Sequence, residues 1–325
     1  MKKVLILAAT VLFFAAMNLG IYCTVTRKTA NNFSAIGQIK MIDVKLYLPF
    51  EEDSALARVD TDTKIEGDLP VMDGAAALVP VYASVIDNLY PEGCVTFEGG
   101  KFDDNNYYGE NFAPDSKMQY KNTVRGFTAV VDGDTDLFLT AYPSEEQFKY
   151  AEEQGVELEC VPIGREAFVF FVNKDNPVNE LTSDQIRQIY NGRITNWNEV
   201  GGADLLINPL TRIKGSGSQT MMDKFMGDTE IKPRKLLSVF GGGLGYSFRF
   251  YLSGMVANQN VKMLTVDGVY PDKESIRNGT YPLAAKFFVV YRKDNTNPNV
   301  QKVVDWMLSD EGQKMIEEVG YVTIN

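Results

Sequence analysis

The chain has 325 residues, 45% of them hydrophobic, which is enough for two domains that each bury a core. Its net charge of −11 makes nucleic acid and anionic lipid poor partners. Histidine is absent, which excludes Ser-His-Asp and Cys-His nucleophiles and most zinc sites. We therefore expect neither an enzyme nor a metal site, and no cofactor.

The N-terminus has the pattern of an export signal, because Lys2 and Lys3 precede an almost unbroken apolar run from Val4 to Tyr22. The core of a cleaved signal has about 7–15 residues and a spanning helix about 20, so the run favours a retained anchor. Cleavage, or lipid modification at Cys23, are the alternatives. We expect residues 1–28 to be a signal peptide or membrane anchor. The rest of the chain would then be exported and tethered at the cell surface or in the periplasm.

Residues 29–68 contain strand-like fragments between Ile39 and Leu48, followed by an acidic polar stretch. We interpret them as a linker and an N-terminal extension packed on the first domain. Beyond Cys23 the cysteines are Cys94 and Cys160, and neither has the spacing of a metal site. They could pair in an oxidising compartment, but two separate buried thiols are the interpretation that we favour.

From Leu69 onwards strand and helix patterns alternate, which predicts an α/β fold with helices on the faces of a sheet. Thr182 and Gln185 form a capping box that predicts a helix start. The four glycines and one leucine of 241–245 predict a tight connection. The expected strands are 69–72, 94–97, 136–140, 156–161, 167–172, 205–210 and 286–291. The expected helices cover 75–90, 123–131, 150–154, 182–190, 217–226, a segment opened by Pro298, and 311–319.

The segment after the expected strand 205–210 has the composition of an anion site. Arg212 is followed by Ser216, Gly217 and Ser218, and a helix is expected to open at Gly217. Free amides at a helix N-terminus carry about half a positive charge, glycines let the backbone approach a ligand, and an arginine can bind two oxygens at once. The alternative is a Gly/Ser loop that only caps a helix. The segment lacks the GxxxxGK[ST] pattern of nucleotide hydrolases.

Two other helix starts are candidates for the same ligand. Asp73 and Gly74 precede Ala76 and Ala77, whose backbone amides no bulky side chain would cover. Alanine runs are also simply good helix formers. Thr123 is the third candidate, with a structural cap as its alternative. None of these starts is specific alone.

The sequence resembles the phosphate-binding proteins of ABC importers, members of the type II periplasmic binding superfamily, from about Leu69 to the C-terminus. The resemblance implies that Arg212, Ser216, Gly217 and Ser218 hold phosphate, with Thr123 as a further hydroxyl contact. The chain departs from the family pattern at Ala76, where a small hydroxyl residue is usual, and at Ala141, where an aspartate accepts the proton of hydrogen phosphate. The segments that match the family most specifically are 171–177, 181–182, 189–192, 194–197, 200–202, 212 and 215–218.

The resemblance implies a two-lobed fold in which each lobe is a mixed sheet flanked by helices. Lobe one would comprise residues 69–168 plus 287–325 and lobe two residues 169–286, with two crossing strands as the hinge. The implied function is capture of phosphate or a similar oxyanion between the lobes, as a monomer that delivers it to an ABC permease. A membrane-anchored sensor or surface-binding module without transport duty is the alternative.

Overall fold

The computed structural model describes residues 42–99, 112–212, 214–232, 241–257 and 259–325. The expected signal or anchor, and Cys23 within it, lie outside these residues. Within the described segments, no helix is long and apolar enough to cross a membrane.

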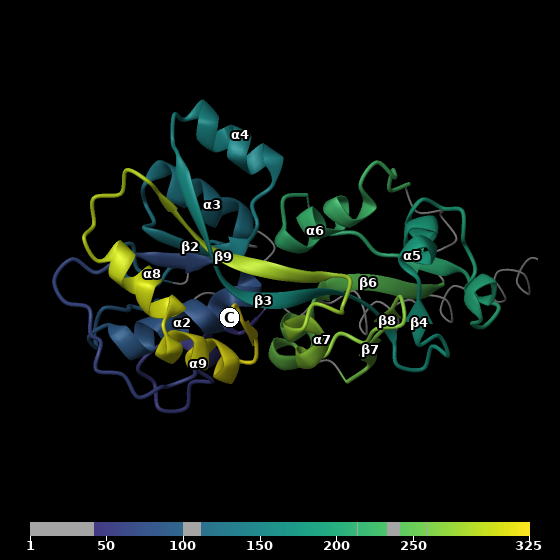
Figure 1. The fold of residues 1–325 in the computed structure, drawn as a ribbon, viewed down its shortest axis with the longest axis horizontal. Coiled ribbons are helices and arrows are strands. Elements are labelled where there is room, and N and C mark those ends of the chain that lie inside the picture. Colours follow the sequence, from purple (N-terminus) through teal and green to yellow (C-terminus); the bar gives the residue numbers. More distant parts are fainter. Residues whose placement is uncertain (1–41, 100–111, 213, 233–240, 258) are drawn as a thin grey trace, which may run out of the picture.

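The framework is a mixed sheet that runs through the whole molecule (Figure 1). Its strands follow the order β1-β2-β9-β3-β6-β5. Strand β10 pairs with the middle of β3, and β7 pairs with the C-terminal end of β3. Strands β1 and β2 are parallel, as are β5 and β6. Strand β9 is antiparallel to β2, and β3 is antiparallel to both β9 and β6. The bounds are β1 Met72–Gly74, β2 Leu137–Ala141, β3 Leu158–Asn173, β5 Ile207–Pro209, β6 Gly242–Phe248, β7 Val261–Met263, β9 Ala284–Arg292 and β10 Val322–Thr323, with a small parallel pair of β4 Glu180–Leu181 and β8 Thr265–Val266.

Helices cover this sheet in two groups that define two lobes. The helices α2 Val79–Leu89, α3 Asn122–Asp132, α4 Glu145–Glu153, α8 Val300–Leu308 and α9 Asp310–Val319 surround β1, β2 and β9 in lobe one. The helices α5 Ser183–Tyr190, α6 Gly217–Met226 and α7 Lys273–Arg277 surround β5, β6 and β7 in lobe two (Figure 1). Short turns of other types are η1 Val44–Tyr47, η2 Ala76–Leu78, η3 Trp197–Val200 and the π-helical η5 Tyr251–Met255.

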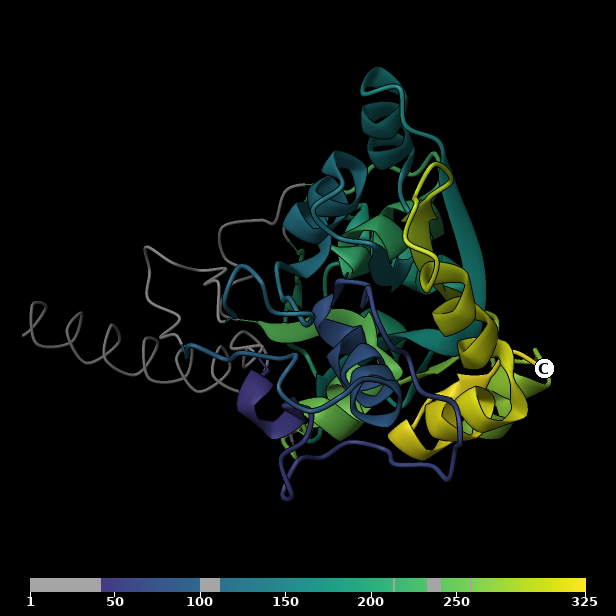
Figure 2. The ribbon, with the colours of Figure 1, turned by 90° about the vertical axis from the view of Figure 1, so that its left-hand side faces the viewer.

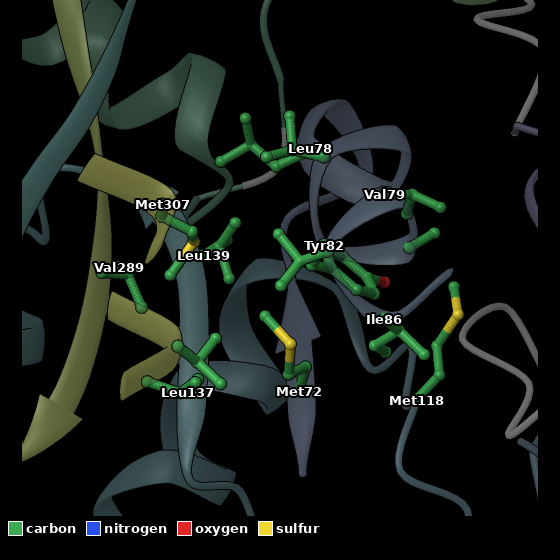
Figure 3. Packing of buried hydrophobic residues seen from close by; sticks show 14 of the residues in the cluster. Met72, Leu78, Val79, Tyr82, Ile86, Met118, Leu137, Leu139, Val289 and Met307 are labelled. Carbon is green, nitrogen blue, oxygen red and sulfur yellow. The ribbon is translucent and has the colours of Figure 1, made fainter. Parts of the chain in front are cut away.

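Strand alternation explains why lobe one has helices on both faces of its sheet. Leu137 and Leu139 of β2 belong to the large core cluster that includes Tyr82 of α2 (Figure 3). The residue between them, Phe138, points to the other face and packs edge-on against Phe127 of α3, with ring centroids 6.3 Å apart. Lobe two has a separate core cluster.

The long strand β3 connects the two cores. Its Ile163 belongs to the core of lobe one, and residues 167–172 belong to the core of lobe two. Strand β9 pairs with β3 from Leu158 to Ala167 and runs between the lobes beside it (Figure 1). The exact lobe boundaries at residues 168 and 287 stay a prediction.

The N-terminal extension wraps around lobe one. Ala57 N donates to Ser84 Oγ at 3.1 Å and Val59 N to Asn88 Oδ1 at 2.9 Å, which ties the extension to α2. Farther on, Thr61 Oγ1 donates to Glu311 Oε2 at 2.5 Å, at the start of α9. Figure 2 shows this purple segment running along the lobe towards the yellow C-terminal helices.

Several local predictions are confirmed. Thr182 caps α5 and Gln185 completes the capping box, Gly133 ends α3 at φ +88°, and α6 opens at Gly217. Others are wrong. Residues 44–47 form a 3₁₀ turn in place of a strand fragment, and 94–97 forms no strand but contributes Phe97 to an isolated bridge with Phe112. The two strands expected at 156–161 and 167–172 are one continuous strand.

The glycine run also differs from its prediction, because 242–248 is strand β6 and no tight connection. A Cβ atom on Gly245 would lie 2.5 Å from the Phe171 ring across the strand pair, and one on Gly242 would lie 2.7 Å from Trp197 Nε1. The glycines are therefore needed for the close approach of aromatic side chains and not for a turn.

Candidate functional site

Arg212 is held by its backbone just after β5. Its amide donates to Gln219 Oε1 and to Tyr246 Oη, each at 3.0 Å, and the Tyr246 hydroxyl donates to Gln219 Oε1 at 2.5 Å. Burial raises the pKa of Tyr246 to about 12, so this hydroxyl keeps its proton at neutral pH. The three residues come from three elements, which fixes the position of the Arg212 backbone.

The Arg212 side chain brings an unsatisfied cationic donor to the site. Its Nη1 atom is buried and has no hydrogen-bond partner among the residues that the structure describes. A buried guanidinium nitrogen without an acceptor is costly, since most buried polar groups in proteins are paired. An oxyanion is the partner that a guanidinium binds best.

The loop before α6 comprises residues 214–218 and comes shortly after Arg212 in the chain. Gly215 has φ +81°, which favours glycine, and Ser216 is the N-cap of α6, with its Oγ accepting from Gln219 N at 3.3 Å. The capping alternative is therefore realised at Ser216. It does not exclude ligand binding, because a hydroxyl that accepts one hydrogen bond can still donate another. The partly buried Ser216, Gly217 and Ser218 stand at a helix N-terminus, where backbone amides lack intrahelical partners.

This loop faces the start of α3 in lobe one. A Cβ atom on Gly217 would lie 4.0 Å from Thr123 Oγ1, and one on Gly215 would lie 3.2 Å from Val124 Cγ2. Thr123 is not the N-cap, which is Lys121, but a buried residue of the first turn. An exposed ion pair also joins the lobes, with Lys214 Nζ 2.9 Å from Glu146 Oε1 of α4. Such pairs contribute at most about 1 kcal/mol, so the pair marks proximity more than stability.

Ala76 and Ala77 form η2, at the entry to α2, and both are partly buried. The Ala77 carbonyl accepts a hydrogen bond from the hydroxyl of Tyr321 near the C-terminus. The methyl side chains offer no hydrogen bond, so only backbone amides of this turn can serve a ligand.

Asp73, three residues before Ala76, is a fully buried carboxylate next to the start of α3. Its Oδ1 accepts from Gly74 N at 2.7 Å and from Lys121 N at 3.0 Å, whereas its Oδ2 is buried and has no partner within the described segments. Burial raises the pKa of Asp73 to about 6 against the lowering by these amides. Ala141, at the end of β2, is buried and has no acceptor in its side chain.

The structure thus brings Thr123 to the loop that carries Ser216, Gly217 and Ser218, with Arg212 just before it. The sequence did not predict the roles of Gln219 and Tyr246. Gln219 had a weak signal, since it lies one turn into the helix after the serines. Tyr246 had none, because the glycine run before it was interpreted as a connection.

Metal binding and nucleophilic catalysis by a thiol are the other kinds of chemistry to consider. Among the described residues no group of His, Cys, Asp and Glu could hold a metal ion. Cys94 and Cys160 are partly buried and form no disulfide within the described residues, and burial raises the pKa of each thiol to about 11. Neither thiol is therefore activated as a nucleophile.

Comparison with known proteins gives the family. The model of the PBP superfamily domain matches residues 106–311, which is more than half of the chain. The chain belongs to the PBP superfamily. Among curated PBP relatives, a phosphate-binding protein PstS from Staphylococcus epidermidis is 30% identical over 220 residues, covering 62% of this chain and 67% of the relative. The namesake from Bacillus subtilis is 25% identical over 227 residues, covering 66% and 73%.

Solved structures agree with this assignment. A PBP-type protein from Clostridium perfringens, solved with bound phosphate, superposes with a TM-score of 0.59 at 22% identity, over 79% of this chain and 99% of that one. An ABC-type phosphate transport receptor from Vibrio cholerae superposes with a TM-score of 0.53 at 19% identity, over 78% and 99%. The fold is therefore the two-lobed type II periplasmic-binding-protein fold, and the resemblance to the phosphate-binding proteins of ABC importers is confirmed.

Proposed function

We propose that this protein is an extracytoplasmic solute-binding protein that captures phosphate or a similar tetrahedral oxyanion between its lobes. The observation that carries the proposal is the buried Nη1 of Arg212, which has no partner among the described residues. It stands beside a serine-rich helix N-terminus that faces Thr123 of the other lobe. A guanidinium, hydroxyls and free amides together replace the water shell of a compact anion. The names of the PstS relatives state phosphate as their ligand, which supports the same ligand class here.

Contacts from both lobes make the closed arrangement the one that a ligand stabilises. Lobe two supplies Arg212, Ser216, Gly217 and Ser218, and lobe one supplies Thr123 and the amides of Ala76 and Ala77. A ligand shifts a two-state equilibrium towards the state in which it has more contacts. The closed, loaded monomer would deliver its anion to an ABC permease, and the N-terminal segment would export the chain and tether it to the membrane.

The choice between phosphate and other oxyanions depends on lobe one. Ala76 and Ala141 supply neither a hydroxyl nor a carboxylate, so discrimination against a fully deprotonated anion such as sulfate is weaker than a carboxylate at residue 141 would give. Binding without turnover is the expected activity, and phosphate monoesters should not be hydrolysed.

Isothermal titration calorimetry tests the proposal. Protein freed of carried-over ligand by partial unfolding and refolding is titrated with phosphate, arsenate and sulfate. We expect saturable heat with at least one of the three. Absence of heat with all three, from protein whose circular dichroism is native, would contradict the proposal.

Replacing Ser216 with alanine is expected to weaken binding by about 1–3 kcal/mol, because one hydroxyl donor is lost in a buried site. The same change removes the N-cap of α6 and should lower the free energy of unfolding by about 1 kcal/mol. Ser309→Ala is the matched control, since Ser309 caps α9 of lobe one and accepts from Gly312 N at 3.2 Å. It should lose similar stability in urea unfolding and keep full affinity. Equal affinities of the two variants would assign Ser216 to capping alone.

A further inference from the structure

Asp73 combines features that a purely structural carboxylate lacks. It is the middle residue of β1 and is completely buried. One oxygen, Oδ1, accepts hydrogen bonds from two backbone amides, and for the other, Oδ2, the described part of the chain offers no partner. Buried side-chain oxygens without partners are uncommon in folded proteins, and each calls for an explanation.

The surroundings of Oδ2 place it beneath the first turn of α3. A Cβ atom on Gly126 would lie 3.2 Å from Oδ2 and 2.4 Å from the Phe138 ring. Glycine at residue 126 therefore leaves the space that the carboxylate occupies. Asp73 is held against the same helix start that carries Thr123 of the candidate anion site.

The charged groups around Asp73 do not fully stabilise its negative charge. Lys121 and Arg125, before and within the first turn of α3, attract it. From α2, the Tyr82 phenol faces it, but burial holds the pKa of Tyr82 well above 10, so that side chain is neutral. From β2, the neighbour is the apolar Phe138 ring. Burial outweighs both cations, and the pKa of Asp73 is about 6.

A bound anion would lie close enough to change this balance. Lys121 N is 3.0 Å from Oδ1, and Thr123 is two residues farther on, a span of at most about 7 Å. A hydrogen bond to Thr123 adds about 3 Å, so an anion that contacts this residue lies within about 13 Å of the carboxylate. At that separation and an effective dielectric constant of about 20, like charges raise the pKa of the acid by about one unit.

We propose that Asp73 takes up a proton from solvent when an oxyanion binds, so that ligand capture is coupled to protonation of the protein. The carboxylate becomes a carboxylic acid, and no bond of the ligand forms or breaks. This inference rests on the proposed function, because it requires an anion at Thr123. The inference goes beyond the proposed function because the affinity would depend on pH through Asp73, a residue outside the serine loop.

The direction of the pH dependence follows from linkage. Below the pKa of the free protein Asp73 is neutral in both states, and affinity is at its highest. As pH rises through about 6 and then through the higher pKa of the complex, affinity falls by about tenfold in total, which is the one-unit difference in pKa. At pH values between the two, binding should take up about half a proton per anion.

Calorimetry in buffers of different ionisation enthalpy measures this proton. Wild-type protein is titrated with phosphate and with sulfate, which does not titrate in this range, and Asp73→Asn is titrated in the same buffers. We expect the variant to take up about half a proton less near pH 6.5, to bind about tenfold more tightly than wild type at pH 8, and to match it at pH 5. Asp73→Ser is a second neutral variant in case the asparagine does not fold.

Asp272→Asn is the matched control. Asp272 is the N-cap of α7 in lobe two, and its pKa is lowered mainly by the Ser275 amide, so it stays charged throughout this range. Its replacement should leave proton uptake unchanged.

Three outcomes would contradict these proposals. If wild type and both Asp73 variants bind an oxyanion with the same number of protons taken up, the inference is overturned and the proposed function stays intact. Loss of affinity in the variants at every pH would also overturn it, since Asp73 would then be a direct acceptor for the ligand. No binding by wild type would contradict the proposed function itself.

Discussion

Replacing Arg212 with alanine is expected to weaken oxyanion binding by about 2–5 kcal/mol, or roughly 30- to 5,000-fold. The reason is that the alanine variant loses the guanidinium beside the loop, whose buried Nη1 has no partner in the described part of the chain. The amides of α6 would then face the anion without a compensating full charge. Calorimetric titration with the best-binding anion measures the effect.

The variant separates charge from general damage because Arg212 is anchored through its backbone. The bonds from Arg212 N to Gln219 and Tyr246 do not involve the side chain, so the loop should keep its position in Arg212→Ala. Lys224→Ala is the control, since it removes one exposed positive charge from the same lobe at helix α6. It should bind within about twofold of wild type, because exposed charges contribute little. Retained affinity in Arg212→Ala would show that the anion binds elsewhere.

Replacing Arg249 with methionine is expected to lower the free energy of unfolding by about 3–5 kcal/mol, the range for breaking a buried ion pair from one side. Arg249 follows β6, and its Nε lies 3.3 Å from Oε1 of Glu166 on β3, close enough for an ion pair although not aligned for a hydrogen bond. The side chains are only 11% and 4% exposed. The variant would leave the Glu166 charge buried, held by the amides of Ala167 and Phe250 alone.

The loss should become smaller as pH falls. Burial already raises the pKa of Glu166, with Arg249 as the largest opposing influence. Without Arg249 this pKa rises further, and protonation then removes the unpaired charge more readily at low pH. Urea unfolding at pH 8 and at pH 5.5 measures the difference between variant and wild type.

An exposed pair provides the comparison for Arg249. Arg277 Nη2 lies 2.5 Å from Glu317 Oε1, and both side chains are nearly half exposed. Arg277→Met should therefore cost no more than about 1 kcal/mol at either pH. Equal effects of the two arginine variants would mean that the Glu166 site is hydrated and not truly buried.

The pair also links the hinge to the site. Arg249 Nη2 donates to Gly320 O at 2.6 Å, and the next residue, Tyr321, packs on Phe250 and donates to the Ala77 carbonyl. These contacts connect β3, β6 and the C-terminal segment to the turn before α2. A loosened pair should therefore disturb the lobe-one side of the site as well as overall stability.

Local signals in the sequence were sufficient where one segment carries all the information. The Thr182 and Gln185 capping box, the end of α3 at Gly133 and the start of α6 at Gly217 each depend on residues within one or two turns. The loop of Arg212, Ser216, Gly217 and Ser218 could be recognised for the same reason. Its glycines and hydroxyls are adjacent in sequence, and a helix N-terminus attracts anions wherever it occurs.

The other features of the fold and site depend on contacts between residues that lie far apart in the chain, so only the tertiary structure could reveal them. Residue 245 has no room for a side chain because the ring of Phe171 fills the space above it, and no pattern within 241–245 encodes that ring. Arg212 is held by Tyr246, 34 residues away. From the sequence, Asp73 was expected only to precede the helix start at Ala76. The packing of α3 on β1 buries it, and burial gives this carboxylate the raised pKa on which the coupling to an anion depends.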